Sequence, residues 1–180
     1  MANCCMYTIK ATGKMEDVKE FVRMLKWKGN PPNEGFGRIM SAYVSCEEPL
    51  ERGLFSCEVE GDCAWSIRSS MLNIDGKRNP SLETETKRLN LAVEAYSQES
   101  GCCFQEHFLI VRGEILTNEC LDWYEYNIED LDGEDLQETC ATHHITEEAL
   151  REKADANDGW ISFGGFGDSY NSFSDLTSYF

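Results

Sequence analysis

Hydrophobic and polar positions alternate at the start of the chain and then change to a helical period. In residues 4–12, apolar side chains recur at every second position, which predicts a strand. Residues 14–28 place their apolar side chains three or four positions apart, which predicts an amphipathic helix. Gly29 and the Pro31-Pro32 pair are expected to end this helix.

The next apolar positions predict a hairpin after a long connection. The connection covers residues 29–53 and has room for a short strand around residues 38–46. Apolar and polar side chains alternate over residues 55–60, and Gly61-Asp62 has the composition of a tight turn. Apolar positions over residues 65–71 then fit a return strand. We therefore expect two antiparallel strands that meet at Gly61-Asp62.

A second helix and a fourth strand complete this pattern. The sequence Asn79-Pro80-Ser81 predicts a helix start with Ser81 as the N-cap, and Leu91–Ser97 predicts a strand. The expected order is strand, helix, strand, strand, helix, strand. This order is typical of the ferredoxin-like split βαβ arrangement, an antiparallel sheet with both helices on one face.

The chain continues beyond that unit with a second hairpin. The segment FLIVRGEIL at residues 108–116 turns at Arg112-Gly113. Its apolar side chains fall on both faces, so we expect it to extend the sheet and to be central or covered. In residues 119–138, one set of apolar positions fits a helix, whereas Trp123 and Tyr126 fit a strand that continues the hairpin.

A helix and an aromatic tail end the chain. Residues 146–158 predict a helix that Thr146 caps and Gly159 ends. Seven of the 21 residues from Trp160 to Phe180 are aromatic. Large aromatic side chains usually pack, so we expect Trp160 and Phe163 to lie against the domain, whereas the segment from Tyr170 onward can pack or stay exposed for recognition.

Charge is distributed unevenly along the chain. The 180 residues carry 16 basic and 33 acidic side chains, a formal net charge of −17. Residues 1–92 contain 13 of each, so the whole excess lies in residues 93–180. Nine carboxylates and no Lys or Arg occur from Glu119 to Glu138. Because phosphates bind cations, this composition argues against direct nucleic-acid binding through a basic surface.

Other features of the composition narrow the setting. Nine cysteines without an export signal indicate free thiols in the reducing cytoplasm. No apolar run approaches the length of about 18 residues that a membrane span needs. We therefore expect a cytoplasmic protein, with no membrane partner, whose 41% of apolar residues form a packed core.

Three segments resemble those of a known group of proteins. They are the opening M-A-N-x-C with I-K-A-T-G, FQEHFLIVRGEILTNECLDWYEY at residues 104–126, and GGFG at residues 164–167. The chain resembles small ferredoxin-like proteins carried by phages and plasmids, although these commonly have Trp in place of Cys4. The resemblance implies a fold and a mobile-element setting but no reaction. Some acidic phage proteins of this size are anti-CRISPR or other anti-defence inhibitors, which suggests such a role by analogy.

An acidic surface can imitate the charge of nucleic acid. Each DNA strand carries one charge per about 3.4 Å, and side chains on one face of a β-strand lie about 6.7 Å apart. Such a surface would be attracted to the basic groove of a nucleic-acid-handling protein, whereas the alternative is a solvated face that aids solubility. The residues expected to bind a partner are Asp122, Trp123, Tyr124, Glu125, Glu129, Asp130, Asp132, Glu134 and Asp135, with Trp123 and Tyr124 as aromatic anchors.

Metal and thiol chemistry are weaker alternatives. Cys140 and His143-His144 form a compact group that zinc could bind, but the sequence contains no C-x-x-C pair. Cys102-Cys103 lies near His107, but neighbouring carboxylates oppose the lowered thiol pKa that a nucleophile needs. We assign no catalytic, cofactor-binding or metal-binding residue.

The sequence thus predicts an α+β protein with two parts. Residues 1–126 form a ferredoxin-like domain with an extra hairpin, and residues 127–180 form an acidic helical segment with a Gly- and aromatic-rich tail. We expect a non-enzymatic, phage-type anti-CRISPR inhibitor of a basic nucleic-acid-binding host protein, with a Cas9-type nuclease as the first candidate. The alternatives are a structural or interaction protein of a mobile element and a small metal or thiol enzyme. Homodimer formation is left open.

Overall fold

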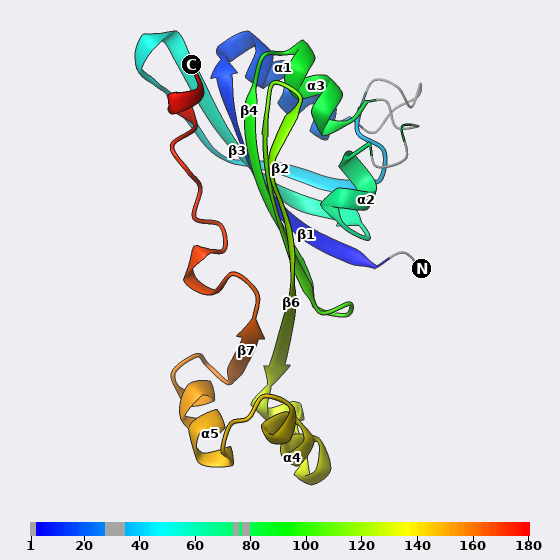
Figure 1. The fold of residues 1–180 in the computed structure, drawn as a ribbon, viewed down its shortest axis with the longest axis vertical. Coiled ribbons are helices and arrows are strands. Elements are labelled where there is room, and N and C mark those ends of the chain that lie inside the picture. Colours follow the sequence, from blue (N-terminus) through cyan, green and yellow to red (C-terminus); the bar gives the residue numbers. More distant parts are fainter. Residues whose placement is uncertain (1–2, 28–34, 74–75, 77–79) are drawn as a thin grey trace.

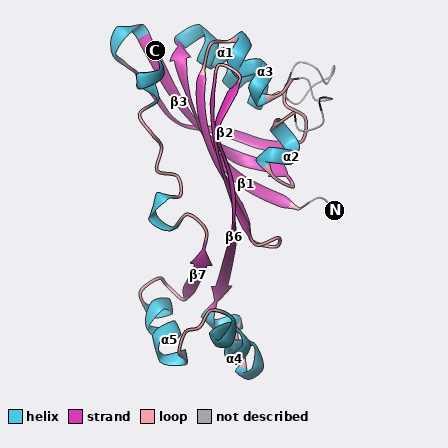
Figure 2. Ribbon diagram, viewed as in Figure 1, coloured by secondary structure: helices cyan, strands magenta, loops and turns pink. Residues whose placement is uncertain are grey.

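The computed structural model describes residues 3–27, 35–73, 76 and 80–180. It is an α+β protein with a seven-stranded antiparallel sheet, and the described residues include five α-helices (Figures 1 and 2). The strands are β1 (Cys4–Lys14), β2 (Ile39–Pro49), β3 (Leu54–Ala64), β4 (Ala92–Glu99), β5 (Phe104–Val111), β6 (Glu114–Asn127) and β7 (Trp160–Gly164). The helices are α1 (Met15–Leu25), α2 (Ile67–Met71), α3 (Leu82–Arg88), α4 (Gly133–Thr142) and α5 (Glu147–Asp155).

The strands lie in the order β2-β3-β1-β4-β5-β6-β7, and each neighbouring pair is antiparallel. Helix α1 connects β1 to β2, and α2 and α3 connect β3 to β4. All three helices contribute to the main core, which includes Tyr7, Ile9, Phe21, Leu25 and Phe108, none more than 2% exposed. Within the described residues, no helix combines the length and the apolarity needed to cross a bilayer.

The first strand and helix form where the apolar pattern predicts them. Strand β1 buries every second side chain in its first half, and α1 buries the stripe that contains Val18 and Phe21. Glu16 and Asp17 lie in the first turn of α1 and Arg23 in the last, as the helix dipole favours. The predicted stop at residues 28–32 lies outside the described residues, and within them α1 ends at Leu25.

The hairpin predicted at Gly61-Asp62 is wrong. Strand β3 continues through both residues, and the turn lies earlier, at the 3-10 turn Glu51–Gly53 between β2 and β3. A Cβ atom at position 61 would overlap the Ser41 carbonyl of β2 and approach the Tyr7 hydroxyl of β1. Position 61 therefore requires glycine because three strands approach each other closely there, and not because the chain reverses.

The predicted return strand at residues 65–71 is also wrong, because residues 67–71 form helix α2. The Ser66 hydroxyl accepts a hydrogen bond from the Ser69 N–H and so caps this helix. The buried Glu106 carboxylate accepts a hydrogen bond from the Ile67 N–H at 3.0 Å. An N-cap and a buried long-range acceptor thus favour a helical turn over the extended alternative.

The later elements match the prediction more closely. Ser81 caps α3 in a capping box with Thr84, and β4 follows as expected. The second hairpin turns at Arg112-Gly113 and extends the sheet. Gly113 has φ +91°, a conformation that glycine adopts without strain. Only β5 is covered as predicted, because Ile115 and Leu116 of β6 are 38% and 45% exposed.

The ambiguous stretch 119–138 contains both predicted structures in succession. Strand β6 continues to Asn127, and α4 begins at Gly133. The last five residues of β6, Trp123–Asn127, leave β5 and pair with β7. We call residues 123–164, which comprise this end of β6 with α4, α5 and β7, the distal lobe; Figure 1 shows it projecting from one end of the sheet. Its own small core contains Leu136, Leu150, Ala154 and Ile161.

Residues 165–180, here called the C-terminal strap, return from β7 along the sheet (Figure 1). Leu176 of the strap is buried against Ala92 and Leu109, which lie on the face without helices. On the same face, the Glu94 carboxylate accepts hydrogen bonds from the Ser174 N–H at 2.6 Å and from its hydroxyl at 3.2 Å. The strap therefore covers the β4–β5 part of this face.

Replacing Gly61→Ala is expected to destabilise the protein by about 1–3 kcal/mol, because the new methyl group must displace the backbone of β2 or the Tyr7 hydroxyl. Urea unfolding followed by circular dichroism measures this change. Gly37→Ala is the matched control, since no atom of the described residues beyond its chain neighbours lies within 4 Å of the added Cβ there. Equal stabilities of the two variants would contradict the packing role of Gly61.

Candidate protein-binding surface

The distal lobe and the strand that leads to it carry most of the excess negative charge. Residues 119–160 contain 14 acidic and two basic side chains. None of the seven predicted carboxylates forms an ion pair within the described part of the chain. All seven are exposed: Asp122, Glu125, Glu129, Asp130, Asp132, Glu134 and Asp135.

The three cations of the second half of the chain have other contacts. Arg112 donates to the Tyr179 carbonyl at 2.6 Å, at the hairpin end away from the lobe. Arg151 pairs with Glu147 at 2.9 Å. Lys153 donates to the Ser162 carbonyl at 3.0 Å and lies 4.8 Å above the Phe163 ring. The negative field of the carboxylates predicted to bind is therefore not neutralised by these cations.

The structure separates the seven carboxylates into two groups. Asp122 and Glu125 lie on β6, where an odd spacing places side chains on opposite faces of the strand. The other five lie in the 3-10 turn Ile128–Asp130 and at the start of α4. We call these five the tip carboxylates: Glu129, Asp130, Asp132, Glu134 and Asp135. The tip carboxylates all fall in the short continuous stretch Glu129–Asp135, which favours a shared binding surface.

The two tryptophans of the lobe have exchanged their predicted roles. Trp123, predicted as an exposed anchor, is only 5% exposed, whereas Trp160, predicted to pack, is 49% exposed. Trp123 pairs with Gly164, and a Cβ at Gly165 would lie 2.9 Å from its indole ring. The two glycines thus let the backbone pass close to Trp123. Trp160 starts edge strand β7, and its neighbour Ile161 faces the lobe core instead.

Tyr124, the second predicted anchor, belongs to a half-buried aromatic cluster. The His143 ring stacks on Phe163 with ring centroids 3.8 Å apart, and Tyr124 contacts His143 edge-on at 5.3 Å. The Tyr126 hydroxyl lies within hydrogen-bond distance, 3.2 Å, of His143 Nε2. Burial, with the nearby His144 and Lys153 charges, lowers the pKa of His143. The cluster joins β6, α4 and β7, so Tyr124 has a structural contact here.

The groups considered for metal or thiol chemistry are not brought together. In residues 3–27, 35–73, 76 and 80–180, no three His, Cys, Asp or Glu side chains gather as a metal site. Cys140 packs against the lobe core, while His143 lies in the aromatic cluster. A hydrogen bond with Glu99 raises the pKa of the Cys102 thiol, the reverse of what activates a nucleophile.

His107 instead forms part of a buried polar contact that sequence reasoning missed. Its Nε2 lies 2.8 Å from the Glu94 carboxylate, which is 1% exposed and also binds Ser174. Burial alone would raise the pKa of Glu94, but the hydrogen bonds from His107 and Ser174 outweigh it and leave this pKa below its ordinary value. The sequence did contain a signal for this contact: Glu94 is a charged residue inside the otherwise apolar strand segment AVEAY, and a buried charge needs a partner.

The aromatic residues of the strap surround Tyr96, which stacks on His107 with centroids 4.3 Å apart. Phe166, Tyr170 and Phe173 meet Tyr96 edge-on at 6.0, 5.6 and 5.6 Å. The tail from Tyr170 onward therefore contacts the sheet through its rings. Of the two alternatives that the sequence left open for this tail, packing and exposure, the structure shows packing.

Comparison of the chain with protein-family models, with curated proteins and with solved structures finds no significant match. Function is therefore inferred from the geometry of the chain itself. The feature that most directly points to a binding partner is the set of exposed tip carboxylates on a lobe with its own core.

Replacing Trp123→Ala is expected to lower the free energy of unfolding by about 3–5 kcal/mol, because the indole is buried under the Gly164-Gly165 backbone. Trp160→Ala, the matched control, is expected to change it by less than about 0.5 kcal/mol. Chemical denaturation of both variants measures the difference. A larger loss for Trp160→Ala would reverse the assignment.

Replacing Glu94→Gln is expected to cost about 1–3 kcal/mol and to loosen the strap, because the charge is lost and an amide nitrogen replaces the oxygen that accepts from one of the two Ser174 donors. The pKa of Glu94 is lower in the folded chain than its value of about 4.3 in the unfolded chain, so the ionised carboxylate stabilises the fold at pH values above about 4.3. This stabilisation is lost as the pH falls through the lowered pKa. The NMR signal of the Ser174 amide should therefore shift below about pH 4.3 in the native chain. The same titration of Glu94→Gln should lack this step, and Glu119→Gln, at the exposed second contact of His107, should retain it.

Proposed function

We propose that this protein is a non-catalytic inhibitor that binds a basic nucleic-acid-handling protein through its distal lobe. The observation that carries the proposal is the group of five tip carboxylates, all exposed and without an ion pair in the described part of the chain. A surface of one charge sign attracts a partner of the opposite sign before contact and aligns it. The tip would then take the place of phosphates in the partner's groove.

The size and construction of the lobe support this role. Helix α4 has ten residues, so it is about 15 Å long and, like any α-helix with its side chains, about 10–12 Å across. A DNA duplex is wider than this, because its major groove alone is about 12 Å wide. A groove that holds nucleic acid is therefore wide enough for α4 and its preceding turn. The separate core around Leu136 and Leu150 would keep the tip folded while it is inserted.

The setting proposed for the inhibitor is a phage-type protein that acts on host defence in the cytoplasm of the host cell. An effector nuclease of the Cas9 type is the first candidate target, because it holds a guide-target heteroduplex in a positively charged channel. The acidic lobe has the opposite charge, and the segments at residues 104–126 and 164–167 carry the resemblance to phage and plasmid proteins. Trp160, an exposed aromatic residue of the lobe, would anchor the contact together with the carboxylates.

We also infer a ferredoxin-like split βαβ unit for residues 4–99. Three observations support it: the order β2-β3-β1-β4, the antiparallel pairing throughout, and the burial of α1, α2 and α3 in one core with the sheet. In this interpretation the β5–β6 hairpin extends a common scaffold, and the lobe is an addition at its end.

A second function, an interaction protein of a mobile element with a merely solubilising acidic half, has one specific observation in its favour. Asp132 occupies the N-cap position of α4, and Glu134 and Asp135 lie in its first turn. Acidic side chains stabilise a helix N-terminus by about 0.3–1 kcal/mol each. Three of the five tip carboxylates therefore have a reason to be acidic without any partner.

The decisive experiment neutralises the tip carboxylates together as Glu129→Gln, Asp130→Asn, Asp132→Asn, Glu134→Gln and Asp135→Asn. Binding to a purified Cas9–guide complex and inhibition of DNA cleavage are then measured at several salt concentrations. The association rate is expected to fall at least about tenfold and to lose most of its salt dependence. Thermal unfolding checks that the variant still folds.

The matched control removes five exposed carboxylates that lie outside the lobe: Glu16, Glu47, Glu48, Glu51 and Asp168. It should bind and inhibit nearly as the native chain does. If both variants lose binding equally, the partner responds to net charge alone. If the folded tip variant inhibits normally, the proposed mechanism is wrong.

A further inference from the structure

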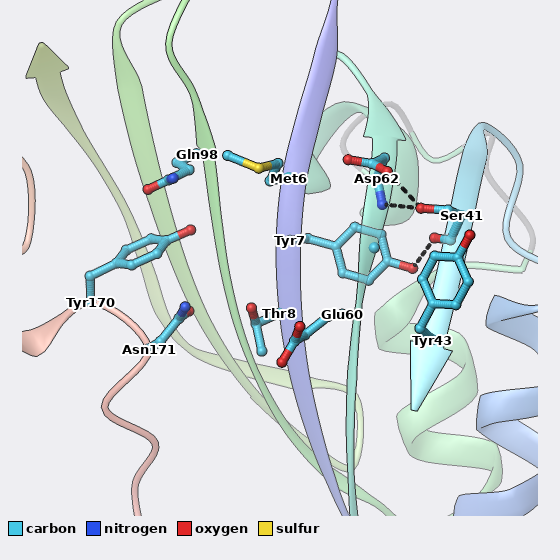
Figure 3. A pocket seen from close by; sticks show the side chains of 11 residues that line it. Met6, Tyr7, Thr8, Ser41, Tyr43, Glu60, Asp62, Gln98, Tyr170 and Asn171 are labelled. Carbon is cyan, nitrogen blue, oxygen red and sulfur yellow. Dashed lines mark hydrogen bonds between the residues drawn. The ribbon is translucent and has the colours of Figure 1, made fainter. Parts of the chain in front are cut away.

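The face of the sheet opposite the helices is hollowed between the C-terminal strap and β2. The hollow has a volume of about 480 Å³ and is lined by residues of β1, β2, β3, β4 and the strap. Figure 3 shows Tyr170 of the strap on one side and Tyr43 of β2 on the other, with Met6 and Thr8 of β1 between them. Tyr43 is 69% exposed and Met6 is 52% exposed, so solvent reaches both.

The hollow is acidic, and among the described residues no Lys or Arg belongs to its lining. The side chain of Glu60 on β3 is exposed and forms no hydrogen bond or ion pair within the described residues. The carboxylate of Asp62, two residues along β3, accepts a hydrogen bond from the Ser41 hydroxyl at 2.6 Å. Lys10, on the same face, is already paired with Glu58 at 3.2 Å. The carboxylate of Glu60 is therefore free to bind a cation from solvent.

This acidity is hidden in the charge totals, because residues 1–92 are neutral overall. Several basic side chains of this half lie on the helices, for example Lys19 and Arg23 on α1 and Lys87 on α3. The register instead places Glu60 opposite Thr8, and Asp62 opposite Met6, on the open face. Glu60 and Asp62 thus lie on one face of the sheet, while cations elsewhere in residues 1–92 balance them in the total.

The walls of the hollow are held in place before any ligand arrives. Tyr7 donates its hydroxyl hydrogen to the Ser41 carbonyl at 2.8 Å, which ties β2 to β1 across Gly61. A register irregularity between Ile39 and Ser41 lies at the same point of β2. On the other side, Tyr170 packs edge-on against Tyr96 at 5.6 Å. Neither wall has to form on binding.

We propose that this hollow binds an arginine side chain presented by a basic segment of a partner protein. A planar guanidinium can pair with a carboxylate such as Glu60 and stack on a tyrosine ring at the same time, whereas an ammonium lacks the planar stacking surface. From β4 to β2 the hollow crosses three strand spacings, about 14 Å, which fits about four extended residues. This site lies on the sheet and does not depend on the function proposed for the distal lobe.

The probe for the test is an acetylated tetra-arginine amide, titrated into the full chain and followed by amide NMR signals. Its neutral isostere, the tetra-citrulline peptide, is the ligand control. The arginine peptide should shift the signals of Met6, Thr8, Gly61 and Gln98, and the citrulline peptide should not. Signals confined to residues 123–164 would assign the peptide to the distal lobe and overturn the proposal.

Glu60→Gln is expected to weaken peptide binding about two- to fivefold, the usual value of one exposed ion pair. Glu47→Gln is the matched control: it removes one exposed charge from β2, but on the helix side, opposite Cys57. Glu60→Asp keeps the charge and should retain most of the affinity. Equal effects of Glu60→Gln and Glu47→Gln would show that the peptide responds only to net charge, and the proposal would fail.

Thr8→Lys provides a second, independent variant, because it places an ammonium group in the hollow. It should weaken the peptide about tenfold or more by like-charge repulsion, whereas Thr8→Ser should bind normally. Unchanged binding by a folded Thr8→Lys variant would exclude the hollow as the site. Sedimentation of the native chain tests a second copy as the occupant: a dimer that Thr8→Lys disperses would overturn the proposal.

Discussion

Strand β6 is longer than its neighbour β5, and its backbone needs partners along its whole length. An unpaired, buried peptide group costs free energy comparable to a lost hydrogen bond, and an open strand edge invites association. The residues of β6 up to Asp122 pair with β5, the Trp123 N–H donates to the Cys103 carbonyl at 2.9 Å, and Trp123–Asn127 pair with β7. This requirement brings the chain back after α4 and α5. The distal lobe and the start of the strap both follow from it.

The hydrophobic core of the distal lobe is small, whereas the negative charge that the lobe carries is large. Four buried apolar side chains, with partly buried neighbours such as Ile128 and Phe163, support a segment rich in carboxylates. Like charges on one small unit repel each other, and a small core offsets this repulsion only modestly. A partner that supplies cations would relieve the repulsion. The same charges that weaken the isolated lobe would therefore strengthen a complex.

Local sequence signals predicted the elements that depend on local physics. The alternation in β1, the apolar stripe of α1, the Ser81 cap of α3 and the Arg112-Gly113 turn all act within a few residues of chain. Gly61 was misinterpreted because the constraint that requires glycine there is the close approach of the Ser41 carbonyl, twenty residues away in the chain. The tryptophan roles were reversed because the cover over Trp123 comes from Gly165, more than forty residues later. The acidic hollow was missed because charge totals do not record which face of a strand a side chain occupies.

The strap adds a mechanical property to this architecture. The chain leaves the sheet through β6 and returns through residues 165–180, which Leu176 and Ser174 attach to β4 and β5. A unit held by one strand can twist about that strand, whereas a unit held by two separate segments can only bend about the line that joins them. Tyr170 lies on the second segment and also forms a wall of the acidic hollow. The Phe166 N–H already donates to the Gln105 side chain of β5 at 2.9 Å, so the strap is fixed next to the lobe and restricts rotation of the lobe relative to the sheet.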